Sequence, residues 1–218
     1  MSNDRAGVMV SSWKDQDKVA EYTGRVGRLA ARRAGEAEAL EALPDEVTRI
    51  MDLGCGDGRL MELVLDARPE LTEVIGLDNS PPMLELARRR FAGEARVTIT
   101  EHDLDQAVIG MHDIDAVISG FAIHHLSHRR KRSLFGEIVA ALRPGGVFAN
   151  LEVVQCATAE LHEEFNRRIE RPGGDPQDIL AEVEPQLQWM RTAGLTQVDC
   201  NWRWRGFALL VGEKPAVG

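Results

Sequence analysis

Cysteine, positive charge and long apolar stretches are all scarce in this 218-residue chain. The three cysteines, Cys55, Cys156 and Cys200, lie too far apart for a metal-binding pair and fit a reduced, cytoplasmic compartment. Lys and Arg number 26 against 35 acids, a formal charge of −9, which argues against a nucleic-acid partner because such surfaces depend on Lys and Arg. No apolar run approaches about 18 residues and no secretory signal pattern is present, so we expect neither membrane spanning nor export.

What the chain does have is a glycine-rich turn, Ile-Met-Asp-Leu-Gly-Cys-Gly-Asp-Gly-Arg-Leu, at residues 50–60. An apolar run that ends in Asp52 predicts a strand, and a helical pattern follows the glycines. Glycine permits unusual φ values and lets a ligand approach the backbone. Dinucleotide-binding turns follow the pattern G-x-G-x-x-G, whereas this one is G-x-G-x-G, flanked by Asp52 and Asp57. Two carboxylates would repel a pyrophosphate but can accept from an ammonium group, so the turn favours a ligand with a zwitterionic amino-acid moiety.

Strand and helix patterns alternate through the centre of the chain, which predicts an α/β fold with a parallel sheet and helices on both faces. The expected strands end near residues 52, 78, 100, 119 and 152. One or two helices in 13–43 precede them, although three glycines weaken the case for continuity. The polar segment 155–185, with Pro172-Gly173-Gly174 at its centre, fits an insertion or lid. A helix at 186–193 and a hairpin, with Val198, Cys200, Trp202 and Trp204 on one face, complete the chain.

A single domain, 1–218, is therefore expected, with four parts. These are an N-terminal helical cap (1–44), a cofactor-binding core (46–152), the lid (155–185), and a terminal helix and hairpin (186–218).

Three successive strands end in an acid or lead straight to one, namely Asp52, Asp78 and Asp103. In an open parallel sheet, ligands bind beyond the carboxyl ends of the strands. Asp78 follows Gly56 by 22 residues, about the distance at which a carboxylate accepts from ribose hydroxyls. Capping of the next helix by Asp78 or Asn79 is the alternative. Ser80, followed by Pro81, is also expected as an N-cap.

The glycine turn resembles motif I of the class I S-adenosylmethionine-dependent methyltransferases, whose loop commonly follows D-x-G-x-G-x-G. The resemblance covers residues 46–152 and, less closely, the terminal hairpin. It implies a Rossmann-like, seven-stranded, mostly parallel sheet, S-adenosylmethionine as cofactor, and methyl transfer to an oxygen or nitrogen of a small molecule. It also implies that Asp103 accepts from the adenine amino group, that the Leu104 backbone contacts the ring edge, and that Met83 forms an apolar wall, although a core role for Met83 is equally open. The residues then expected around the cofactor are Tyr22, Asp52, Gly54, Cys55, Gly56, Asp78, Asn79, Met83, Asp103, Leu104 and Ser119.

The methyl-donating end is expected near the segment Ser119-Gly120-Phe121-Ala122-Ile123-His124-His125-Leu126. Similar small-molecule methyltransferases carry an apolar-His-His-Leu sequence there. A histidine can serve as a base near neutral pH, and His124 is the expected catalytic residue, with His125 and a purely structural histidine as alternatives. Further candidates for the acceptor pocket are Trp13, Tyr22, Glu152 and His162; no metal is expected.

Several alternatives stay open at this point. Asp78-Asn79-Ser80-Pro81 also looks like the corresponding segment of carboxy-S-adenosylmethionine synthases, which would mean a modified cofactor. An RNA-modifying methyltransferase and a cofactor-binding protein without transferase activity are further possibilities. A nicotinamide-dependent oxidoreductase is disfavoured by the glycine spacing and Asp57. The sequence leaves the acceptor, the methylated atom and the oligomeric state open.

Overall fold

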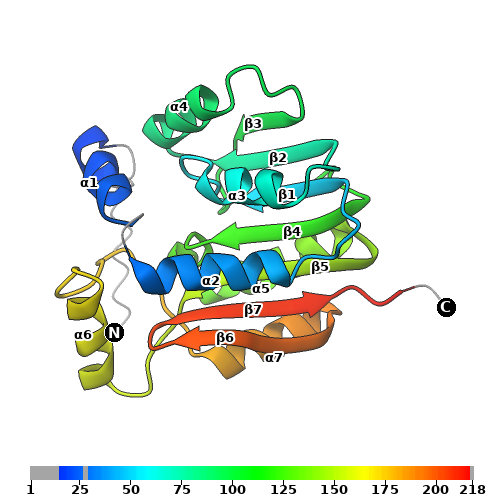
Figure 1. Cartoon of the computed structure of the whole chain (residues 1–218). Helices are drawn as coiled ribbons and strands as arrows, with labels where there is room; N and C mark the ends of the chain where they lie inside the picture. Colours follow the sequence, from blue (N-terminus) through cyan, green and yellow to red (C-terminus); the bar gives the residue numbers. More distant parts are fainter. Residues whose placement is uncertain (1–14, 27–28, 217–218) are drawn as a thin grey trace.

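The computed structural model, which describes residues 15–26 and 29–216, is a seven-stranded sheet between two layers of helices (Figure 1). Its elements are α1 (Gln16–Val26), α2 (Ala30–Glu41), β1 (Arg49–Leu53), α3 (Arg59–Ala67), β2 (Glu73–Asp78), α4 (Pro81–Arg90), β3 (Val97–Glu101), β4 (Ile114–Gly120), the 3₁₀ turn η2 (Ile123–His125), α5 (His128–Ala141), β5 (Leu142–Val153), α6 (Ala159–Arg168), α7 (Val183–Ala193), β6 (Thr196–Trp204) and β7 (Phe207–Glu213). The strand order is β3-β2-β1-β4-β5-β7-β6. β1 to β5 run parallel, and β7 is antiparallel to both β5 and β6. The predicted fold class is confirmed.

Alternation along the strands builds two apolar cores, one on each face of the sheet. Ile50 of β1 faces α2 and α3, whereas its neighbour Met51 faces α5 and α7. Both side chains are almost fully buried. Strands that are apolar on both faces are the pattern of a parallel sheet covered by helices.

α2 continues through Gly35, one of the glycines that made helix continuity uncertain in the sequence. A Cβ on Gly35 would lie 2.8 Å from side-chain carbons of both Leu151 and Trp202. The glycine therefore lets α2 lie close against β5 and β6, and this packing outweighs its low helix propensity.

Three details of the predicted elements are wrong. β5 begins at Leu142 rather than at Val147, and α7 begins at Val183 rather than near residue 186. The hairpin does not keep its four apolar side chains on one face. Cys200 pairs with Leu210 and Trp202 with Leu209, so β6 carries a bulge between them. Cys200 consequently packs on the α5/α7 face and Trp202 on the α2/α3 face.

The carboxyl ends of the five parallel strands meet along one edge of the sheet, on the left in Figure 1. α1 and α6 lie beyond this edge. The segment expected to be an insertion or lid contains α6, whose Phe165 is fully buried against the hairpin. Within the described ranges, no helix has the length and apolar character needed to cross a bilayer.

Candidate active site

A cavity of about 560 Å³ lies at the carboxyl edge of the sheet. It is lined by residues from the ends of β1, β2 and β4, from the loops that follow β1 to β4, and from the first turns of α3 and α4. Two residues of the segment before α7 and one of α2 complete the lining. Nine of the residues expected around the cofactor are among them: Asp52, Gly54, Cys55, Gly56, Asp78, Asn79, Met83, Asp103 and Leu104. Pockets of this size are typical of small-ligand sites.

The glycine turn needs glycine for two separate reasons. Gly54 has φ 74°, and an added Cβ would lie 2.1 Å from the Ala122 Cβ, so the β1 loop packs directly on the loop after β4. Gly56 has φ 55°, and among the described residues an added Cβ would have the Met83 sulfur, at 3.9 Å, as its one neighbour within 4 Å. A side chain at Gly56 would therefore extend into the cavity, whereas one at Gly54 would disrupt the packing of the two loops.

Asp52 is an unpaired buried acid. It is 1% exposed, and neither carboxylate oxygen has a hydrogen-bond partner among the described residues. Burial, and then the nearby Asp78 and Asp57 carboxylates, raise its pKa to about 8. A buried carboxylate without a partner is costly, and a cationic group bound in the cavity would relieve that cost.

The Asp78 carboxylate accepts hydrogen bonds from the backbone of two segments that line the cavity. Its Oδ2 accepts from the Gly56 N–H and its Oδ1 from the Ser80 N–H, each at 2.8 Å. Burial raises its pKa, against the opposing effect of these hydrogen bonds. The cap of α4 is Ser80, as predicted, because its hydroxyl accepts from the Met83 N–H. The helix is therefore capped without Asp78, which leaves the carboxylate at the cavity wall.

The far end of the cavity lies beyond β3. Asp103 accepts from the Asp105 N–H at 3.0 Å, and the Leu104 carbonyl accepts from Arg130 at 2.6 Å. Met83 is buried and still lines the cavity, so it belongs to both the helix packing and the wall. An adenine-binding role for these residues stays a prediction.

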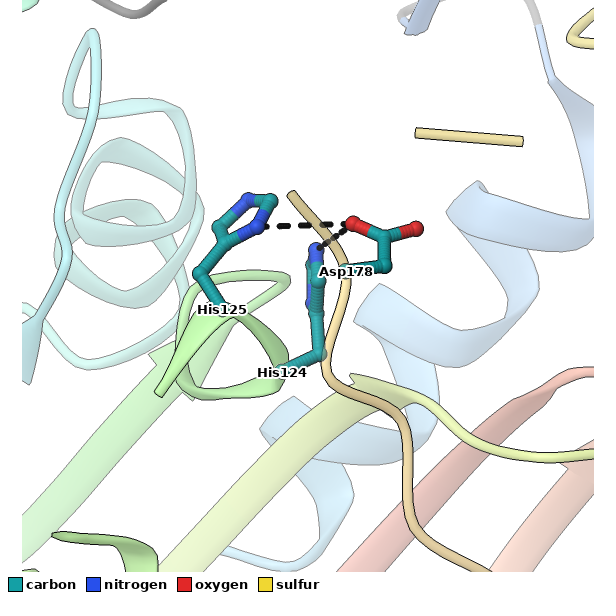
Figure 2. A group of neighbouring side chains, drawn as sticks. All are labelled: His124, His125 and Asp178. Carbon is teal, nitrogen blue, oxygen red and sulfur yellow. Dashed lines mark ion pairs between the residues drawn. The ribbon is translucent and has the colours of Figure 1, made fainter. Parts of the chain in front are cut away.

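At the other end, two histidines of η2 meet an aspartate from the segment before α7 (Figure 2). His124 lies behind the cavity wall and His125 lies in the wall. Asp178 Oδ1 lies 3.4 Å from His124 Nε2 and 3.4 Å from His125 Nδ1. On its other side, His124 Nδ1 lies 2.6 Å from Glu152 Oε1, at the end of β5.

Burial decides the protonation of this cluster. It lowers the pKa of His124 to about 4 and that of His125 to about 3, so both rings are neutral near pH 7. Burial also raises the pKa of Glu152 to about 7. A general base works best with a pKa near the operating pH, so neither ring matches that requirement well.

The structure places the remaining candidates elsewhere. Ser119 is fully buried outside the cavity lining, and its hydroxyl donates to the Leu53 carbonyl at 2.7 Å. His162 on α6 is also outside the lining. Tyr22 lies on α1, but its side chain, like the whole of Trp13, is outside the described residues. Cofactor contacts by Ser119 and Tyr22 stay predictions.

Sequence reasoning missed Arg32, which lines the cavity beside Phe121. The Arg32 guanidinium lies over the Phe121 ring, 4.5 Å from its centroid, and its Nε donates to Glu36 Oε1 at 2.9 Å. Glu36 also accepts from Arg59, at the start of α3. Two arginines thus share one carboxylate at the rim of the glycine turn. The sequence offered one signal for Arg32, because this arginine lies on the face of α2 that is otherwise buried.

The sheet order, the glycine turn and the acids at the strand ends define an α/β domain of the nucleotide-cofactor-binding class. Residues 50–146 match the family described as "Methyltransferase domain". The chain is 26% identical over 190 residues to a carboxy-S-adenosyl-L-methionine synthase of Desulforapulum autotrophicum, covering 77% of this chain and 75% of that protein. It is 30% identical over 182 residues to a trans-aconitate 2-methyltransferase of Methylobacterium nodulans, covering 78% of this chain and 65% of that protein.

Among solved structures, the S-adenosylmethionine-dependent methyltransferase SibL in its apo form superposes with a TM-score of 0.68 at 22% identity, covering 95% of this chain and 71% of SibL. This likeness shows the fold. The chain spans between about half and three quarters of the lengths of the curated relatives it matches. Residues 50–146 therefore form a methyltransferase domain, and the fold and the curated relatives are those of the class I S-adenosylmethionine-dependent methyltransferases.

The residues present fit the family's cofactor. The unpaired Asp52 carboxylate suits the ammonium of the methionyl group, and the open face at Gly56 leaves room for the ligand beside the turn. The bound cofactor would supply an activated methyl group.

Proposed function

We propose that this methyltransferase acts on an oxygen or nitrogen of a small-molecule acceptor, which binds at the His125 end of the cavity. The observation that supports the proposal most directly is the polarity along the cavity. One end holds the glycine turn and the strand-end acids, and the other is mainly apolar, lined by Phe121, Ala122, Leu126 and Ile179 with His125 and Gln177 as polar groups. The relatives' names include methylation of trans-aconitate, which agrees with a small acceptor.

The chain's own residues divide the work in this proposal. Asp52 accepts from the methionyl ammonium, and Arg32 or Arg59 pairs with the methionyl carboxylate. Asp78 accepts from the ribose hydroxyls and Asp103 from the adenine amino group. Phe121 and Leu126 exclude water from the transfer end, where alignment of the acceptor supplies much of the rate.

His124, the predicted catalytic residue, does not line the cavity and has a low pKa. We propose a positioning role for it instead, in which the His124–Glu152 hydrogen bond holds η2 in place.

Calorimetry and turnover test the proposed function. We expect wild-type protein to bind S-adenosylhomocysteine and not NAD, and to release S-adenosylhomocysteine from S-adenosylmethionine only when a suitable acceptor is added. The acceptor panel should contain hydroxy acids, carboxylic acids and amines. Binding of NAD without S-adenosylhomocysteine would contradict the cofactor assignment. Cofactor binding with no turnover across the panel, or tRNA as the sole acceptor, would contradict a small-molecule transferase.

A further inference from the structure

His124, His125 and Asp178 form the one group of three metal-ligating side chains, with ligand atoms within 4.8 Å of one another, found in residues 15–26 and 29–216 (Figure 2). They come from two segments more than fifty residues apart in the chain, η2 and the stretch before α7. The His124 and Asp178 side chains are 4% and 13% exposed, and that of His125 is 22% exposed at the cavity wall.

The hydrogen bonds of His124 determine which of its ring nitrogens carries a lone pair. Glu152 Oε1 accepts from the Val153 N–H at 2.9 Å, which marks this oxygen as an acceptor. The His124 Nδ1–H therefore donates to the same oxygen at 2.6 Å, and Nε2 carries the lone pair. That lone pair faces Asp178 Oδ1, an oxygen with no hydrogen-bond partner among the described residues. Two acceptors facing each other in a buried site need a cation between them.

The spacing fits a metal ion better than a shared proton. Both nitrogen–oxygen distances are 3.4 Å, and neither contact to Asp178 Oδ1 has hydrogen-bond geometry. A tetrahedral ion with ligands at about 2.0–2.1 Å holds neighbouring ligand atoms roughly 3.3–3.4 Å apart. An octahedral ion of the same size brings adjacent ligands to about 2.9 Å, so the observed spacing favours four-coordination.

The surroundings hold the three ligands in place. The Ile179 N–H donates to the His124 carbonyl at 2.9 Å, and the buried Lys131 ammonium donates to the carbonyls of both residues. These bonds join η2 to the segment that carries Asp178. The His124–Glu152 pair has the form of a second-shell contact, in which a carboxylate orients a metal-binding imidazole. The His125 ring also bonds the Gln177 backbone, a contact on the same segment.

The neighbouring charges are compatible with a divalent cation. Glu152 and Asp178 are the acids of the cluster, and Lys131 directs its ammonium at carbonyl oxygens. The next cation, Arg171, is paired with Asp175.

We propose that His124 Nε2, His125 Nδ1 and Asp178 Oδ1 bind a divalent cation of the Zn²⁺ type at the acceptor end of the cavity. Two histidines and one carboxylate leave a fourth position, the ligand set of many catalytic zinc sites. If the cavity binds an acceptor as proposed above, an acceptor oxygen can fill that position, and coordination would then favour its deprotonated form without a basic histidine.

Zinc binding tests the proposal. Untagged protein, treated with a chelator and dialysed, is titrated with Zn²⁺ against a chromophoric competitor. We expect one Zn²⁺ per wild-type chain, and a Kd raised at least about 100-fold in Asp178→Asn, which keeps the side-chain volume but removes the charge. Glu152→Gln should raise the Kd by about 10- to 100-fold, as second-shell changes do.

The matched control is His112→Gln. His112 pairs with Asp113 at 2.9 Å, but the pair is exposed, and no third ligand joins it in the part of the chain that the structure describes. This variant should bind Zn²⁺ like wild type. Co²⁺ substitution gives an independent measurement, because a four-coordinate ion produces intense visible absorption that Asp178→Asn should lose.

Wild-type protein that binds no stoichiometric Zn²⁺, or Asp178→Asn that binds it within two-fold of wild type, would overturn the metal site. If Asp178→Asn does not fold, His125→Asn, at the partly exposed ring, takes its place under the same criteria. S-adenosylhomocysteine calorimetry on the same samples separates the two proposals, because cofactor binding by metal-free protein depends only on the other end of the cavity.

Discussion

The Gly56 N–H donates a 2.8 Å hydrogen bond to the Asp78 carboxylate, which joins the turn after β1 to the end of β2. The same carboxylate accepts from the Ser80 N–H at the start of α4. Asp78 therefore fixes the shape of two loops as well as facing the cavity. Its replacement should affect the protein in two measurable ways.

Asp78→Ala should weaken S-adenosylhomocysteine binding by roughly ten-fold to over a hundred-fold, because charge-assisted hydrogen bonds contribute about 1.5–3 kcal/mol. Loss of the two backbone contacts should also lower the free energy of unfolding. Calorimetry and urea denaturation measure the two effects. Asp66→Ala, at an exposed acid of α3, is the control and should change neither. An unchanged cofactor affinity in Asp78→Ala would limit Asp78 to a structural role.

Asp52 should make stability and binding depend on pH in opposite directions. Its pKa is about 8 in the folded protein against an ordinary 3.8. Between these values the folded state binds more protons than the unfolded chain, so the stability of ligand-free protein falls as pH rises, by at most about 1.4 kcal/mol per pH unit. Affinity for the cofactor should rise over the same range, since the carboxylate is the form that pairs with an ammonium.

Asp52→Asn removes both dependences. The difference in unfolding free energy between this variant and wild type should grow in the variant's favour from pH 5 to pH 8, while its affinity for S-adenosylhomocysteine stays low and flat. Thermal unfolding and calorimetry across this range provide the comparison. Parallel curves for the two proteins would mean that Asp52 has an ordinary pKa.

Gly54→Ala should destabilise the protein more than Gly93→Ala. Both glycines have positive φ, 74° and 89°, so an alanine at either site incurs about 1–2 kcal/mol of backbone strain. At Gly54 the new Cβ overlaps another group, the Ala122 Cβ at 2.1 Å, whereas at Gly93 no atom of the described residues lies within 4 Å. Overpacking should add about 1–3 kcal/mol. If urea denaturation showed the same loss of unfolding free energy in both variants, the loops after β1 and β4 would have to separate easily.

The parts of the site that could be predicted are those that follow directly from a strand. The glycine turn and the acids near the ends of β1, β2 and β3 are local signals, and the parallel sheet brings them to one edge. The Asp178 contact with His124 could not be predicted, because it depends on how the segment between α6 and α7 folds back onto η2. Arg32 was missed for a similar reason, since its place at the cavity depends on how closely α2 packs at Gly35.

The fold shows the same division between local and tertiary information. Alternation of apolar residues predicted β6 as a strand, but the bulge between Cys200 and Trp202 depends on pairing with β7. A one-residue shift exchanges the faces of a strand. Trp202 therefore packs against Gly35 of α2, a contact that the sequence pattern alone does not contain.

For the lid expected within residues 155–185, the structure favours a shorter stretch, which we predict to close over the cavity. α6 is held by Phe165, whose ring lies 5.0 Å from that of Phe207 and would collide with any side chain at Gly206. The following segment has two glycines with positive φ, Gly173 and Gly174. It leads to Gln177 and Ile179 in the cavity wall. Segments with few buried apolar contacts open at low cost and commonly act as lids.

We therefore predict that S-adenosylhomocysteine slows amide exchange in residues 173–178 and in α1, which carries Tyr22, beyond the slowing in the glycine turn. α6 serves as an internal control, because its packing on the hairpin should leave its exchange unchanged. Hydrogen exchange with and without ligand measures all three segments in one experiment. Phe165→Ala provides a further comparison: releasing α6 from the hairpin should make its exchange respond to ligand as well. Protection confined to residues 52–58, 78–83 and 103–104 would show that neither segment closes, and that the acceptor reaches His125 through an opening that stays the same when the cofactor binds.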